Sequence, residues 1–301
     1  MTQQGATEDR EAITAAIARI RAHPAFPDAF RHIGARFLAL QGDYLANKTV
    51  ADEGRTLVSQ FALSLHAGWR PEDPASGLTL ANLLRVCLKF GVMSHGRVEA
   101  TVAMLRRSGR LMDAPPGPDR RFRRLIPGPL LEAEYRARVR LHLEALEMVE
   151  PGRPYLRRLD TDHAFYWAIE RERGAFLMRQ PAMRVHQPGL AAVTDIEGGY
   201  LCLVALIHAL PDGYTPDEIA FPHAEAAARL DLPRTQLRRA LGVLEGQGLI
   251  VQQGLGGKRI RVLPAAVETL AGWHALRLWR FERNAQRAAA AMDAEAGSTP
   301  R

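Results

Sequence analysis

The sequence predicts a mainly α-helical fold with two small β-hairpins, and three observations lead to this prediction. Alanine and leucine abound while aromatic residues make up only 7% of the 301 residues, which favours helices over a β-sandwich. Apolar residues recur at helical spacing along most of the chain. A segment of roughly 70 residues also occurs twice with the same order of expected elements, so the chain is built from an internal repeat.

Periodicity and breaker residues define the elements of the first half. Pro24 and Pro27 separate helices expected over about 8–22 and 28–40, and a third helix is expected over about 50–66. Residues 68–77 are expected to form a loop. Helices over 78–90 and 96–107 follow, then strands at about 110–112 and 121–126, and then a helix over 129–149. Residues 1–7 are expected to be a loose tail.

The second half follows the same order. Pro151-Gly152-Arg153-Pro154 is the expected linker between domains 1–150 and 151–301. Helices are expected over about 161–177, 200–210, 223–230, 234–244 and 264–292, and strands over 249–253 and 258–263. Residues 178–199 are expected to be irregular, 214–222 to form a loop, and the tail from about 294 to be disordered.

The repeat is defined by apolar residues that coincide when Ser94–Leu105 is placed over Pro233–Leu244. Val98, Val102 and Leu105 fall on Leu237, Leu241 and Leu244, and Gly109 falls on Gly248. Beyond these, the basic segment 121–127 lies over 258–264. The repeated segments, about 78–127 and 220–264, therefore share one expected fold.

Basic and polar residues gather on the faces opposite these apolar stripes. The formal charge of the chain is +7, and local excesses of five positive charges lie between Ser94 and Arg124 and between Pro233 and Arg261. Such a concentration favours a surface that faces phosphates. The candidate contact residues are Arg234, Thr235, Gln236, Arg238, Arg239, Lys258 and Arg259 in the second copy, and Ser94, His95, Arg97, Arg120, Arg121 and Arg123 in the first.

The order of helix, turn, helix and basic hairpin resembles the winged helix-turn-helix domain. Asp119-Arg120-Arg121, followed by Arg123-Arg124-Leu125-Ile126-Pro127-Gly128 and a long helix, is similar to the wing of MarR-type transcriptional regulators, a bacterial family. The resemblance implies that Asp119 braces Arg121, which enters the minor groove. The second wing, Gly256-Gly257-Lys258-Arg259, lacks such an aspartate. MarR-type proteins are typically homodimers with one unit per chain, so this chain is expected to act as a monomeric pseudo-dimer.

The resemblance implies a sequence-specific regulator of transcription that binds double-stranded DNA. Two alternatives stay open: a plasmid-type replication initiator with tandem winged helices, and a winged-helix module that binds protein. Gly96 and Ala100 are small, which suggests that the first copy grips the DNA backbone while the second supplies more specificity. The resemblance also allows a small-molecule effector pocket lined by Trp167, Trp273, Trp279 and Tyr166, which are otherwise expected to pack in the core.

No pattern in the sequence indicates an enzyme. The histidines are scattered without metal-ligand spacing, and Gly254-Leu255-Gly256-Gly257 leads into a strand, whereas phosphate-binding loops lead into a helix. Hence no catalytic residue, metal or cofactor is expected. Cys87 and Cys202 have no ligand partner and are expected to be buried thiols. The polar N-terminus and the lack of an apolar run of roughly 20 residues predict a cytoplasmic protein without a membrane span.

Overall fold

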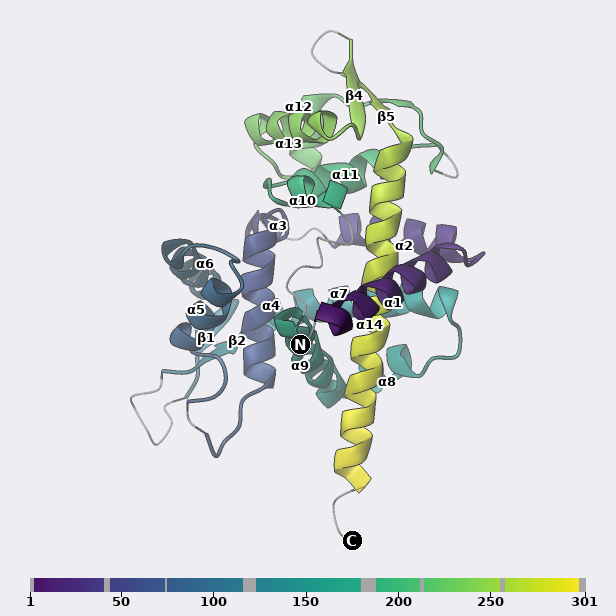
Figure 1. The fold of residues 1–301 in the computed structure, drawn as a ribbon. Coiled ribbons are helices and arrows are strands. Elements are labelled where there is room, and N and C mark those ends of the chain that lie inside the picture. Colours follow the sequence, from purple (N-terminus) through teal and green to yellow (C-terminus); the bar gives the residue numbers. More distant parts are fainter. Residues whose placement is uncertain are drawn as a thin grey trace. The chain divides into compact units, whose positions relative to one another are not determined.

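The computed structural model describes residues 3–40, 44–73, 75–115, 123–179, 188–211, 214–254 and 258–297. This described part is mainly helical and contains two small antiparallel sheets (Figure 1). The expected mainly helical fold with small β elements is therefore confirmed. The first sheet pairs two strands, and the second has three strands in the order β3-β5-β4.

Both halves of the chain contain the same succession of elements. The first half consists of α1 (Gln3–Arg21), α2 (Phe26–Ala39), α3 (Tyr44–Val50), α4 (Glu53–Ala67), α5 (Leu80–Lys89), α6 (His95–Arg107), β1 (Leu111–Asp113), β2 (Leu125–Pro127) and α7 (Pro129–Val149). The second half consists of α8 (Tyr155–Thr161), α9 (His163–Arg179), α10 (Pro188–Thr194), α11 (Gly199–His208), β3 (Glu218–Ala220), α12 (His223–Arg229), α13 (Arg234–Gly246), β4 (Ile250–Gln253), β5 (Arg259–Val262) and α14 (Pro264–Gly297). Only β3 is extra.

Several boundaries differ from the sequence expectation. α1 begins at Gln3 instead of residue 8, the helix expected over 50–66 is α4, and the short helix α3 precedes it in a segment where no helix was expected. The short helix α10 and the strand β3 lie where irregular and loop segments were expected, and α8 lies between the linker expected at 151–154 and the helix expected from 161. α14 continues to Gly297, past the expected start of the tail at about 294, because its last turns are rich in alanine, the strongest helix former.

The chain forms two compact units that are interleaved along the sequence. Unit 1 comprises Met1–Glu53, Glu144–Pro151 and Ala182–Arg280, and unit 2 comprises Gly54–Leu143, Gly152–Pro181 and Phe281–Arg301. This arrangement replaces the sequential division at residue 150. The first helices of each half belong to the unit that contains the hairpin of the other half, so each unit needs both halves of the chain.

A glycine allows a close helix crossing in each unit. In unit 2, α9 crosses α4 at Gly174, where an added methyl group would lie 1.5 Å from Ser64 Oγ. In unit 1, α2 crosses α11 at Gly34, where a methyl group would lie 1.7 Å from His208 Nε2. In both cases the glycine lies on the helix that comes from the other half of the chain.

A buried polar network accompanies the crossing in unit 2. Gln60 Nε2 of α4 donates a hydrogen bond of 2.5 Å to Glu170 of α9, and Arg173 forms an ion pair with the same carboxylate. All three side chains are buried. Because a buried charge must be paired to be tolerated, this network fixes how α9 lies against α4.

The apolar residues that were expected to face inward are buried in both repeats. Val98, Val102 and Leu105 are at most 4% exposed, and Leu237, Leu241 and Leu244 are completely buried. Tyr166 is buried in unit 2, where the ring of Trp167 lies 4.9 Å from it. Cys87 and Cys202 are buried free thiols, as expected, and burial raises the pKa of each to about 12.

Replacing Gly174 by alanine should lower the free energy of unfolding by about 1–3 kcal/mol, because the methyl group forces α9 away from α4. The matched control is Gly242→Ala in α13, where no atom lies within 4 Å of the added methyl group. This control should stabilise the protein by up to about 1 kcal/mol, because alanine favours the helix. Denaturant unfolding measures both values, and equal effects of the two variants would contradict the close crossing.

Candidate nucleic-acid interface

The two repeated segments have the same backbone geometry at the turn between their paired helices. Gly91 follows α5 with a φ of +62°, and Asp231 follows α12 with a φ of +51°. The amide of Val92 donates to the carbonyl of Cys87 at 2.9 Å, and the amide of Leu232 donates to Ala227 at 2.9 Å. The two turns therefore orient α6 and α13 alike against the helices that precede them.

The connections from these helices to their hairpins also match. Gly109 and Gly248 adopt φ values of +69° and +67°, which allow the chain to reverse out of α6 and α13. A side-chain contact then joins each helix to the first strand of its hairpin. Arg106 Nη2 lies 2.6 Å from Asp113 Oδ2 in unit 2, and Glu245 accepts hydrogen bonds of 2.8 and 2.9 Å from Gln252 in unit 1.

In each unit, an extended segment that precedes the first helix of the pair also lies beside the hairpin and forms backbone pairing with it. In unit 1, β5 pairs with β4 on one side and with β3 on the other, where Ile219 is opposite Ile260. In unit 2, Thr79 forms a single bridge with Arg124, and the Thr79 side chain also caps α5 by accepting from the Asn82 amide at 3.1 Å. Both units thus contain a helix pair, a hairpin and a third extended segment.

The outer surface of unit 1 is basic. Arg234, Thr235, Arg238 and Arg239 of α13 are exposed, as are Lys258, Arg259 and Arg261 of the hairpin. Among the described residues, the three arginines of α13 form no ion pair. Their guanidinium groups are therefore available to bind a ligand. We call the exposed residues Arg234, Thr235, Arg238 and Arg239 the α13 basic face.

Gln236 does not belong to this face. Its side chain is half-buried, and Nε2 donates a hydrogen bond of 2.5 Å to the backbone carbonyl of Glu197. The sequence expectation that Gln236 contacts a base is not supported by this position. The amide instead holds the start of α13 against the segment that precedes α11, a partner from a distant part of the chain.

An acidic residue braces the basic hairpin of unit 1. Glu218 of β3 forms an ion pair with Arg259 and lies 3.9 Å from Arg261. Arg259 remains 64% exposed, while Glu218 is 24% exposed. The sequence suggested that this hairpin lacks a bracing acid, because β3 was expected to be a loop. Only the pairing of β3 with β5 brings Glu218 to Arg259.

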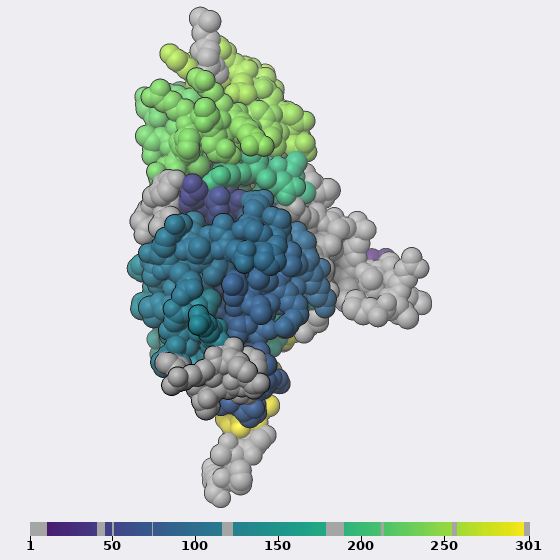
Figure 2. Space-filling model, turned by 90° about the vertical axis from the view of Figure 1, so that its left-hand side faces the viewer, coloured from purple at the N-terminus to yellow at the C-terminus, as the bar shows by residue number. Residues whose placement is uncertain are grey.

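The described part of the outer surface of unit 2 carries basic and polar residues. Ser94, His95 and Arg97 are exposed at the start of α6, and Arg123 is exposed next to β2. His95 Nδ1 lies 3.3 Å from Glu99 Oε2, and Ser94 occupies the N-cap position without a side-chain capping bond. Figure 2 shows the surface of this region, in blue, facing the viewer. Asp119, Arg120 and Arg121 lie outside the described residues.

Arg110 contributes one charge to the positive excess of residues 94–124, but its side chain does not reach the surface. Its side chain is 2% exposed and its guanidinium forms hydrogen bonds and an ion pair with Glu134 of α7. Arg106 is compensated by Asp113. The pair with Glu134 offsets one positive charge of the first repeat, as the pair between Glu218 and Arg259 does in the second.

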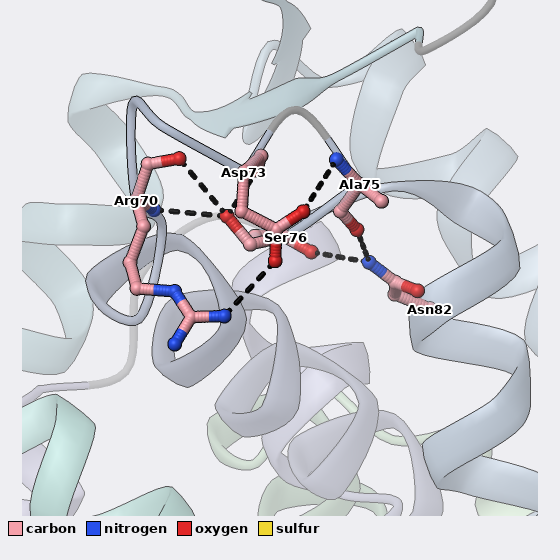
Figure 3. A network of polar contacts seen from close by, with 6 residues as sticks. Arg70, Asp73, Ala75, Ser76 and Asn82 are labelled. Carbon is pink, nitrogen blue, oxygen red and sulfur yellow. Dashed lines mark hydrogen bonds and ion pairs between the residues drawn. The ribbon is translucent and has the colours of Figure 1, made fainter.

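The loop before α5 is ordered by a polar network (Figure 3). Ser76 Oγ donates to the carbonyl of Asp73 at 2.7 Å, and the carboxylate of Asp73 pairs with Arg70 at 2.9 Å. Asn82 of α5 donates to the carbonyls of Ala75 and Gly77, both at 2.9 Å. The adjoining Trp69 stacks on the guanidinium of Arg124, 3.8 Å from its ring centre. The loop therefore links α5 to the hairpin.

Comparisons of the chain with protein families, with curated proteins and with solved structures find no match. Within the described ranges, no group of histidine, cysteine or acidic residues could hold a metal ion. No helix of the described chain combines the length and the apolar character that a membrane crossing requires.

Replacing Gly91 by alanine should reduce the free energy of unfolding by roughly 1–2 kcal/mol, because alanine is strained at positive φ. No atom lies within 4 Å of the added methyl group, so backbone strain alone produces this loss. Gly91→Asn should cost less, since asparagine tolerates the left-handed region. Thermal or denaturant unfolding tests this order, and an equal cost for the two variants would argue against a left-handed turn.

Proposed function

We propose that this protein is a sequence-specific regulator of transcription that binds double-stranded DNA with two winged helix-turn-helix units in one chain. The observation that carries the proposal is the α13 basic face, an exposed helix surface beside a basic hairpin. Arginine side chains on such a helix can form paired hydrogen bonds to the O6 and N7 atoms of guanine. The hairpin residues Lys258 and Arg259 can contact phosphates or the minor groove.

The internal arrangement of each unit supports the same proposal. A helix that reads the major groove must be held rigidly by the helix before it and by the hairpin after it. In unit 1, Asp231 forms the turn before α13, and Glu245 is bonded to the hairpin after it. The matching geometry in unit 2 supports a chain that acts as its own pseudo-dimer.

Two other classes of function fit parts of the molecule. A replication initiator with tandem winged helices would also bind duplex DNA. Binding to origin DNA in place of promoter DNA would distinguish it from a regulator of transcription. A module that binds protein would need no unpaired arginines on α13. The exposed arginines Arg234, Arg238 and Arg239 therefore favour DNA over a protein partner.

Arg238→Ala and Arg239→Ala should each reduce discrimination between bases by about 1–3 kcal/mol. Binding of the full chain to duplexes selected from a random pool, followed by single-base replacements, measures this loss. Arg287→Ala is the matched control, because it removes an exposed arginine of α14 outside both helix pairs. Wild-type binding should weaken steeply with salt, as expected when phosphates are neutralised. A flat salt dependence, or unchanged base preference in both variants, would contradict the proposal.

Glu218→Gln should weaken DNA binding even though it removes a negative charge. The reason is that Arg259 loses the carboxylate that orients it, whereas electrostatics alone would strengthen binding. Glu225→Gln is the matched control, since it removes an exposed acid of α12 that does not contact Arg259. Fluorescence anisotropy at two salt concentrations compares the variants. Tighter binding by both of them would show that Glu218 does not orient the hairpin.

A further inference from the structure

We infer that the two helix-turn-helix units contact DNA differently: α13 of unit 1 reads bases, while α6 of unit 2 contacts the backbone. The target is then an asymmetric duplex with one specified half and one half that tolerates sequence changes. This inference rests on the proposed function. Beyond that function, the inference specifies the class of DNA sequence that the chain recognises.

Equivalent positions of α6 and α13 can be matched because the turns and helix ends of the two helix pairs share their backbone conformation. The turns at Gly91 and Asp231 and the helix ends at Gly109 and Gly248 have the same backbone conformation. Each outward position of α13 therefore has a counterpart on α6. The successive pairs are Arg234 and His95, Thr235 and Gly96, Arg238 and Glu99, Arg239 and Ala100, and Gly242 and Ala103.

The side chains at these positions have opposite chemistry in the two helices. Arg238 and Arg239 are exposed donors, and arginine is the commonest side chain that specifies guanine. Ala100 has no hydrogen-bonding side chain. Glu99 is negatively charged, so phosphates repel it, and its carboxylate is paired with His95 at 3.3 Å. From Glu99 to Ala103, the outward positions of α6 therefore lack the side-chain donors that Arg238 and Arg239 supply on α13.

Unit 2 nevertheless keeps cationic side chains at the margins of this face. Arg97, Arg107 and Arg123 are exposed at the start of α6, at its end and next to β2. Contacts from such residues to phosphates fix the position of a protein on DNA without carrying sequence information. Among the described residues, unit 2 thus keeps exposed cations that can hold the duplex, while the positions of α6 that match Arg238 and Arg239 carry no such donors.

A symmetric homodimer presents two identical helices and reads two identical half-sites, so its target is palindromic. One chain with two different helices has no such symmetry. If a single copy of this chain binds, only the half that contacts α13 is specified. A dimer of the chain would instead present two copies of α13 and would restore a palindrome.

The test selects duplexes from a random pool with the full chain and measures the mass of the complex by light scattering. We expect one non-palindromic motif and one chain per duplex. Combining Arg238→Ala with Arg239→Ala should reduce the preference for this motif at least 10-fold. Glu99→Ala should leave base preference unchanged, and Glu99→Arg with Ala100→Arg should add a preference in the other half.

The possible failures are distinguishable. A palindromic motif, two chains per duplex, or a changed base preference in Glu99→Ala would overturn the asymmetric target while leaving DNA binding intact. The Arg287→Ala variant, which keeps both helix faces, should select the same motif as the wild type. Absence of binding to any duplex at low salt would overturn the proposed function, and the inference with it.

Discussion

The close approach of two helices at a glycine is the constraint on which both compact units depend. Gly34 of α2 leaves room for His208 of α11, and Gly174 of α9 leaves room for Ser64 of α4. Each crossing joins a helix from one half of the chain to a helix from the other half. Neither half can therefore complete a unit alone, and the helix pairs with their hairpins rest on a framework that the whole sequence supplies.

Within this framework, the two repeats share their inner contacts and differ in their outer residues. The turn needs a left-handed residue, which Gly91 supplies in one repeat and Asp231 in the other. The contact between helix and hairpin needs a polar pair, which is Arg106 with Asp113 in one and Glu245 with Gln252 in the other. Side chains that face solvent are under no such packing constraint, so the outer faces can diverge in charge while the fold stays the same.

The sequence predicts what depends on local periodicity and fails where a partner lies far along the chain. Val98 and Leu237 could be assigned to the inner face because helical spacing is a local property. The exchange of helices between units and the pairing of β3 with β5 leave no local signal. For the same reason, the pattern could not distinguish Gln236 and Arg110, which have partners inside the fold, from the exposed arginines beside them.

The ion pair between Glu218 and Arg259 is too weak to explain the presence of Glu218 by the stability of the fold. An exposed ion pair contributes only about 0–1 kcal/mol to stability, and Arg259 is largely exposed. Stabilising the fold is therefore a poor explanation for an acid in the strand beside the basic hairpin. In the proposed complex with DNA, the same carboxylate would repel phosphates. Its presence is favourable only if orienting Arg259 before contact lowers the entropy lost on binding by more than this repulsion costs.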